Sequence, residues 1–250
     1  MQSVERALDV LNALSTRRYP QSALEVSKRM GVHRTIVHRL LRTMAARHIV
    51  QEVAPGSYRL GSAIIQLATQ YLDDLTLRRL ALPHMVDLNS RGLSERGWHV
   101  TLGVPAPSQI VIVERVWDPQ VSLDFLLSFP VGMPMTGSAA GRAFLARLDE
   151  KAALEWTSPE EYAALRPRLD EVNAAGGLSF SSGELMPGIG AMAMAIESGP
   201  HAPVGTLILS GPNLQEEFDP NSPVAQMVAR TALLISGLME SVSKHPVNKD

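Results

Sequence analysis

A group of basic and hydrogen-bonding side chains near residue 40 has the types and spacing that nucleic-acid binding requires. The apolar residues of segment 33–44 recur at i, i+3, i+4 and i+7, which predicts a helix with one buried stripe. The side chains expected on its outer face are Arg34, Thr35, His38, Arg39 and Arg42. Because arginine and histidine donate hydrogen bonds to base edges and phosphates, this face is predicted to contact DNA. For His38, an exposed side chain without a role is an equally good interpretation.

Two glycine-containing patterns resemble motifs of enzymes, and both lack the context that the chemistry needs. The run GIGAMA at 188–193 matches the dinucleotide fingerprint G-x-G-x-x-A, but a strand-like segment follows it where a helix is required. In GSAAG at 137–141, the serine stands one place early for the nucleophile elbow G-x-S-x-G. We therefore expect neither enzymatic activity nor a cofactor.

The composition is that of a globular protein, with 45% hydrophobic and 19% charged residues. The chain has no cysteine, and its seven histidines show no HxxxH-type spacing, so that we predict no disulfide and no metal site. No apolar run approaches the roughly twenty residues that cross a bilayer, and the N-terminus lacks a secretory signal. We expect a cytoplasmic protein without a membrane partner.

The net charge of −2 is distributed unevenly along the chain. Residues 1–61 hold ten Arg and Lys against four Asp and Glu, a net charge of +6, so that the remainder carries −8. This asymmetry indicates a basic module for a polyanion joined to a module with another task.

The segments around the basic helix match a helix-turn-helix. A first helix is predicted from Ser3 to residue 14 or 15, on the three-to-four spacing of its apolar residues. Ser22 and Glu25 stand three apart as in a capping box, and they begin a short helix that Gly31 ends. In such a motif the second helix lies in the major groove, with its N-terminal residues toward the bases.

A hairpin is predicted directly after the basic helix. Strand-like runs at 49–53 and 57–60 are joined by Ala54-Pro55-Gly56, and Arg59 lies on the second run. This hairpin is typical of a wing. A solvated basic face remains the alternative for the arginines, but the turn, the helix order and the hairpin together favour DNA contact.

Six stretches of the sequence resemble the isocitrate lyase regulator (IclR) family of bacterial transcription factors, in the same order along the chain. Three are in the basic module and three in the remainder. They are SVERALDVL at 3–11, TIVHRLL at 35–41, YRLG at 58–61, RLALPH at 79–84, PMTGSAAGRA at 134–143 and GTLILSGP at 205–212.

The resemblance implies an α+β protein of three parts. These are a winged helix-turn-helix at 1–61, a linker helix at 62–74, and at 75–250 a GAF-like sensor domain whose antiparallel sheet is flanked by helices. It also implies a homodimer, or a tetramer of two dimers, on an operator that is an imperfect palindrome. The apolar spacing of segment 62–71 agrees with a linker helix that pairs with another subunit, with a helix buried inside the monomer as the alternative. A sensor protein that does not bind DNA is the competing function, and the basic module argues against it.

Several elements of the sensor domain are predicted from local patterns. Segments 110–116, 121–127, 191–196 and 204–210 have the composition of strands. Ser158-Pro159-Glu160-Glu161 is typical of a helix start, and the apolar residues between Val224 and Leu238 predict a C-terminal helix.

The segment Ser138-Ala139-Ala140-Gly141 precedes a helical pattern, so its backbone N–H groups are predicted to face an anion or carboxylate. From the residues alone, a simply capped helix is an equal alternative, and the resemblance favours a ligand. The family's effector site corresponds in this chain to Ser181, Ala191, Ile208 and Ser210, and we expect Met133, Ile189 and Leu209 to form its apolar wall.

Two of these positions depart from the family pattern, because Ala191 and Ile208 stand where polar residues are common. Fewer polar groups disfavour a compact keto acid and favour a ligand with a larger apolar body. We expect an aromatic acid or a derivative of one as effector, and a ligand-responsive regulator of a catabolic operon. Pro130 also replaces the family's more frequent glycine.

Overall fold

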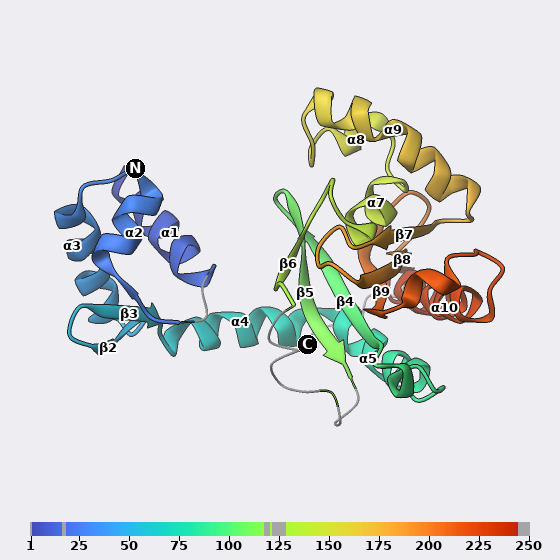
Figure 1. Cartoon of the computed structure of the whole chain (residues 1–250), viewed down its shortest axis with the longest axis horizontal. Helices are drawn as coiled ribbons and strands as arrows, with labels where there is room; N and C mark the ends of the chain where they lie inside the picture. The colour runs from blue at the N-terminus through green and yellow to red at the C-terminus, as the bar shows by residue number, and fades with distance from the viewer. Residues whose placement is uncertain (1, 17–18, 118–120, 122–128, 245–250) are drawn as a thin grey trace. The chain divides into compact units, whose positions relative to one another are not determined.

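The computed structural model describes residues 2–16, 19–117, 121 and 129–244. The chain divides into two compact units, Met1–Asp74 and Leu75–Asp250, and each is described by itself (Figure 1). None of the helices within the described ranges is long and apolar enough to cross a membrane.

Three helices share the core of the N-terminal unit. Ser22 caps the second helix in a complete capping box with Glu25, and Gly31 ends it in the left-handed conformation, with φ of 64°. That conformation suits glycine because it has no Cβ. The predicted short helix, glycine turn and longer helix are therefore confirmed. The helices are α1 (Gln2–Ser15), α2 (Ala23–Met30) and α3 (Arg34–Ala45).

The wing belongs to a three-stranded sheet with the order β1-β3-β2. The predicted hairpin is confirmed as β2 (Val50–Ala54) and β3 (Ser57–Leu60). Strand β1 (Gln21–Ser22) was not predicted, because two residues show no periodicity. The buried Gln21 Nε2 lies 3.3 Å and 3.2 Å from the carbonyl oxygens of Ala13 and Leu14, and it thereby joins the sheet to α1.

Helix α4 (Ala63–Asp74) follows the wing, where a linker helix was expected. None of its residues is buried within the part of the chain that the structure describes. Three of its large apolar side chains are more than half exposed, Ile65 at 65%, Leu67 at 68% and Tyr71 at 57%, whereas Ile64 and Leu72 are half-buried.

Six antiparallel strands form the sheet of the second unit, in the order β6-β5-β4-β9-β8-β7. The strands predicted at 110–116, 191–196 and 204–210 are confirmed as β5, β8 and β9. The one predicted at 121–127 falls, apart from Val121, on residues outside the described part of the chain. Three strands were not predicted: β4, β6 and β7. The spans are β4 His99–Ala106, β5 Gln109–Val116, β6 Gly132–Pro134, β7 Leu178–Ser182, β8 Ile189–Glu197 and β9 Pro203–Pro212.

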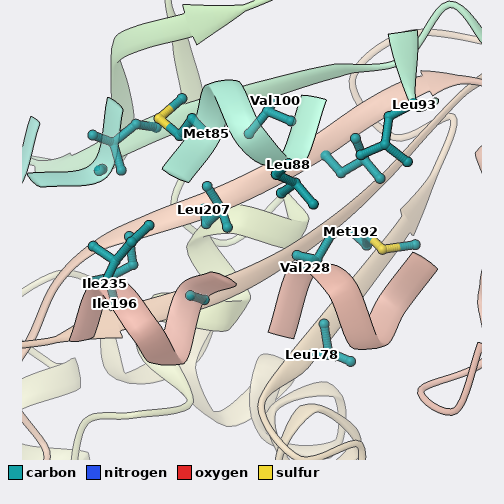
Figure 2. Packing of buried hydrophobic residues seen from close by; sticks show 14 of the residues in the cluster. Met85, Leu88, Leu93, Val100, Leu178, Met192, Ile196, Leu207, Val228 and Ile235 are labelled. Carbon is teal, nitrogen blue, oxygen red and sulfur yellow. The ribbon is translucent and has the colours of Figure 1, made fainter. Parts of the chain in front are cut away.

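Helices cover both faces of this sheet. On one face, α5 and α10 pack over an apolar core in which Met85 and Leu88 of α5 meet Val228 and Ile235 of α10 and Leu207 of β9 (Figure 2). On the other face, α7 packs against β7, β8 and β9 and contacts α9. The predicted helix start at Ser158 and the predicted C-terminal helix are confirmed. The helices are α5 Thr76–Asn89, η1 Ser94–Arg96, α7 Ala139–Leu145, α8 Glu150–Ala153, α9 Pro159–Ala174, η2 Leu214–Glu217 and α10 Pro223–Lys244.

Leu209 lies on the opposite face of the sheet from the one expected. It was predicted as a wall of the effector site, but it is fully buried in the core between the sheet and helices α5 and α10. Successive side chains of a strand point to opposite faces, so Leu209 turns away from the side that its neighbours Ile208 and Ser210 share. Its prediction as a site residue was wrong.

Candidate functional site

The outer face of α3 presents the basic side chains predicted for DNA contact. Val37, Leu41 and Met44 are buried against the rest of the N-terminal unit, and this fixes which face of the helix is outside. His33 caps the helix, with its Nδ1 accepting a hydrogen bond from the Thr35 amide at 3.3 Å. The side chains that the structure leaves exposed on this helix include Arg34, Thr35, His38, Arg39 and Arg42.

Arg59 is exposed on the wing, on β3 rather than on the helix. Its Nε and Nη2 donate to Gln51 Oε1 at 3.1 Å and 3.0 Å, and Gln51 is its cross-strand neighbour on β2. The neutral amide orients the guanidinium without cancelling its charge. The wing therefore presents a positioned cation in the same unit as the basic helix.

The floor of a cavity in the second unit is a row of four side chains on adjacent strands. Strand register places His99 of β4 opposite Ser210 of β9, Ser210 opposite Ala191 of β8, and Ala191 opposite Ser181 of β7. Directly opposite residues have Cβ atoms about 5 Å apart and share one face of the sheet. Residues 10 to 111 positions apart in the chain thus form one surface, a row of three polar side chains with the apolar Ala191 between Ser210 and Ser181.

A β-bulge brings Arg115 to the same cavity. Between β4 and β5 the register shifts, so that Leu102 pairs with Glu114 while Gly103 pairs with Ile112. One extra residue reverses which face the following side chains occupy. As a result, Ile112 and Arg115 both line the cavity although they are three residues apart.

Sequence reasoning missed the contribution of β4. His99 and Thr101 line the cavity, whereas Val100 and Leu102 lie in the opposite core. The alternation of polar and apolar residues at 99–102 is the signal that could have revealed a half-buried strand.

The loop before α7 and the β7–β8 turn provide the remaining described walls. The cavity brings together most of the predicted effector residues: Met133, Ser138, Ala139, Ala140, Ser181, Ile189, Ala191, Ile208 and Ser210. It also includes Phe129, Pro130, Leu185 and Met186, which were not predicted as ligand contacts.

Gly141 does not line the cavity, and its predicted contact with the ligand was wrong. Its amide donates to Ser138 Oγ at 3.0 Å, so Ser138 caps α7 and occupies that N–H group. A Cβ at this position would lie 1.9 Å from the Met135 carbonyl oxygen, which explains the glycine by close packing. The Ser138 hydroxyl in turn donates to the Pro134 carbonyl at 2.8 Å, and only the start of the predicted cradle, 138–140, reaches the cavity.

His99 is the most strongly perturbed titratable group of the cavity. Burial, followed by the positive charge of Arg115, lowers the pKa of its imidazole from 6.5 to about 3. Its Nε2 lies 2.9 Å from Ser210 Oγ, and its ring contacts the Phe129 ring edge-on at 4.4 Å between centroids. At neutral pH the cavity therefore contains a neutral imidazole that can exchange hydrogen bonds with a ligand or with Ser210.

The cavity is small, with a volume of about 40 Å³. Such a volume holds a few water molecules, whereas an apolar cavity that binds benzene measures about 150 Å³. A ligand with an aromatic ring therefore requires a wall of the cavity to move.

The pKa of His99 predicts a pH dependence of stability. Between pH 7 and pH 5 the unfolded imidazole takes up a proton that the folded one does not bind until about pH 3, so acid destabilises the fold. We expect His99→Gln, which cannot titrate, to remove about 2 kcal/mol of this loss in the free energy of unfolding. Urea unfolding at both pH values measures it, with the exposed His201→Gln as the matched control. Equal pH dependence in wild type and His99→Gln would contradict the assignment.

Residues 3–54 match the family model of the IclR helix-turn-helix domain. Similar curated proteins include the glycerol operon regulatory protein of Streptomyces coelicolor, 27% identical over 224 residues that cover 84% of this chain and 85% of that protein. The transcriptional repressor IclR of Escherichia coli is 26% identical over 255 residues, covering 93% of this chain and 88% of that protein. The similarity thus extends through both units.

Solved structures agree with the fold. An IclR transcriptional regulator from Alicyclobacillus acidocaldarius superimposes with a TM-score of 0.71 and 24% identity, over 96% of this chain and 99% of that one. An IclR homologue from Microbacterium hydrocarbonoxydans, crystallised with 4-hydroxybenzoate, gives a TM-score of 0.71 and 21% identity over the same shares. The N-terminal unit therefore contains an IclR helix-turn-helix domain, and the chain as a whole is similar in sequence to IclR-family regulators of operons.

Proposed function

We propose that this regulator controls a catabolic operon in response to an aromatic carboxylic acid or a derivative of one. The observation that carries the proposal is the cavity, in which an apolar centre at Ala191, Ile208 and Ile112 lies between polar groups. Relatives named for the glycerol and acetate operons support the catabolic role. The homologue crystallised with 4-hydroxybenzoate supports the ligand class.

The walls of the cavity favour an anionic ligand with an apolar body. Arg115 contributes positive charge, and the first residues of α7 contribute helix-terminal amides, which interact favourably with negative charge. Ala191 and Ile208 offer no side-chain hydrogen bonds in the middle of the floor, where a compact polar acid would need them. An aromatic ring over Ala191 with its carboxylate toward Arg115 or Ala139 satisfies both conditions.

DNA contact is proposed through α3 and the wing. Arg34, Arg39 and Arg42 place three cations on one exposed helix, and Arg59 adds a fourth on β3. Thr35 and His38 add hydrogen-bonding groups toward the N-terminal half of the helix, the part that reads base edges in this motif.

Arg39→Ala and Arg42→Ala are expected to weaken operator binding. A lost base contact costs about 1–3 kcal/mol, and a lost phosphate contact lowers the salt slope of log K by about one. Fluorescence anisotropy with operator DNA over a salt series measures both effects. Arg91→Ala, an equal charge change at an exposed position just after α5, is the control. Unchanged isotherms for both α3 variants would rule out this face.

We further propose that the chain acts as a homodimer, or as a tetramer of two dimers, through α4. Ile64, Leu67, Ala68 and Tyr71 recur at the spacing of one helix face, and a second helix can bury such a stripe. A two-fold dimer requires an imperfectly palindromic operator, with half-sites about one helical turn or a multiple of it apart.

Leu67→Glu is expected to shift the protein toward monomer, because a carboxylate cannot be buried in an apolar helix pair without a partner. Thr69→Glu introduces the same charge on the opposite side of α4 and serves as the control. Sedimentation velocity at micromolar concentration gives the oligomeric state. A monomeric wild type, or a Leu67→Glu protein that sediments as wild type, would refute the role of α4.

Ala191→Phe is expected to abolish the ligand response, because the ring fills the space over the floor. Benzoate and 4-hydroxybenzoate are suitable probes, and binding to the folded state raises the melting temperature. Calorimetry on the variant should show no binding, while a gel-shift assay should show DNA binding retained. Ala174→Phe, at an exposed position of α9, is the control. Full ligand affinity in Ala191→Phe would mean that the ligand binds elsewhere.

A further inference from the structure

The turn between β7 and β8 forms one wall of the cavity. Leu185 and Met186 line the cavity from this turn. Gly183 and Gly188 bound it, both with positive φ, at 70° and 78°. At its base the Gly183 amide donates to the Ile189 carbonyl at 2.9 Å. The turn is thus a short segment between two residues of high conformational freedom.

One carboxylate in the turn joins it to two helices. Glu184 Oε2 lies 2.8 Å from Arg142 Nη1 of α7, and its Oε1 lies 2.8 Å from Arg168 Nη1 of α9. The Ser181 hydroxyl donates to Oε2 at 3.0 Å. Partial burial acts to raise the pKa of the Glu184 carboxyl, but these three donors together outweigh it and lower the pKa, so the carboxylate stays charged at neutral pH.

Arg142 makes this contact strong. Its side chain is only 3% exposed, and its Nη2 also donates to the Phe180 carbonyl at 2.8 Å. A buried guanidinium that loses its carboxylate leaves an uncompensated charge, which is strongly destabilising. The ion pair between Arg142 and Glu184 therefore opposes any outward movement of the turn.

The floor strands and α7 are less able to yield. The floor strands are paired in register on both sides of Ala191 and Ser210, and every residue of α7 is buried. The turn, in contrast, is largely exposed, and hydrogen bonds at its base and the ion pairs of Glu184 attach it to the rest of the unit. With a cavity volume of about 40 Å³, admission of a ring requires displacement of a wall.

We infer that the β7–β8 turn is the movable wall of the effector cavity and that Glu184 is the positioning residue that holds it closed through Arg142 and Arg168. Leu185 and Met186 then determine how large a ligand body the closed cavity admits. Ser181 connects the cavity to the Glu184 ion pairs, because its side chain lines the cavity and its hydroxyl donates to Glu184. A ligand that displaces the turn or competes for Ser181 consequently disturbs the contacts of α7 and α9. The inference rests on the proposed function only where it identifies the ligand.

The absence of cysteine from the chain allows a direct test. Met186→Cys places a single thiol on the cavity side of the turn, and its rate of alkylation by N-ethylmaleimide reports how often the turn opens. Glu184→Gln in this background should raise the rate about tenfold, because glutamine has one acceptor oxygen and no charge for two arginines. Arg168→Gln should raise it by a smaller factor, and Arg168→Lys should restore most of the protection.

Arg166→Gln is the matched control, since Arg166 and Arg168 are on the same helix and both side chains are 56% exposed. Its nearest carboxylate oxygens are 3.7 Å away, on Glu150 and Asp170, and the labelling rate should not change. Urea unfolding of each variant separates local opening from loss of the fold, and Arg168→Gln provides a readout even if Glu184→Gln does not fold. Equal labelling rates in the Met186→Cys parent and in its folded Glu184 and Arg168 variants would overturn the inference.

A second arm repeats the labelling with millimolar benzoate. Faster labelling of Met186→Cys with benzoate bound, because the ring holds the turn displaced, supports both the movable wall and the ligand class. If benzoate and 4-hydroxybenzoate change no rate while Glu184→Gln still accelerates labelling, the positioning role of Glu184 holds and the proposed ligand class is wrong.

Discussion

The antiparallel register of β4, β9, β8 and β7 determines where the side chains of the cavity floor lie. It aligns His99, Ser210, Ala191 and Ser181 in one row across four strands. The same alternation sends Val100, Leu209 and Met192 into the opposite core. Because a slip of one residue would exchange the two sets, the core beneath α5 and α10 and the cavity beneath α7 depend on the same backbone hydrogen bonds.

The two faces of this sheet differ in the types of side chain that they bury. The α5 and α10 face is filled with large aliphatic residues, which stabilise the register by burial. The α7 face contains small and polar residues over the floor, and it encloses charge at Arg142 and a neutral imidazole at His99. Apolar packing on the α5 and α10 face thus offsets the free-energy cost of burying polar groups on the α7 face. The sheet can therefore hold the polar side chains of the cavity in fixed positions.

Local patterns in the sequence were sufficient to predict the three helices and the hairpin of the N-terminal unit, though not its short strand β1. The features that predicted these elements are local. They include the capping box of Ser22 and Glu25, the glycine turn at Gly31 and the apolar spacing of α3, in which each residue is related to others three or four positions away. For the same reason the helix start at Ser158 could be predicted from four residues. The resemblance to the family then identified most of the cavity residues, including Ser181, Ala191 and Ser210, without showing how they meet.

By itself, the sequence determined the helix-turn-helix, its exposed basic face, and the strands whose residues alternate or are continuously apolar, because these depend on local propensity and periodicity. Only the tertiary structure decided that Leu209 belongs to the core, that Gly141 packs against a carbonyl, and that a bulge turns Arg115 toward the cavity. It also decided that Glu184 meets Arg142, 42 residues earlier, and Arg168. Such contacts follow from strand register and from close packing between distant segments, and neither leaves a periodic signal along the chain.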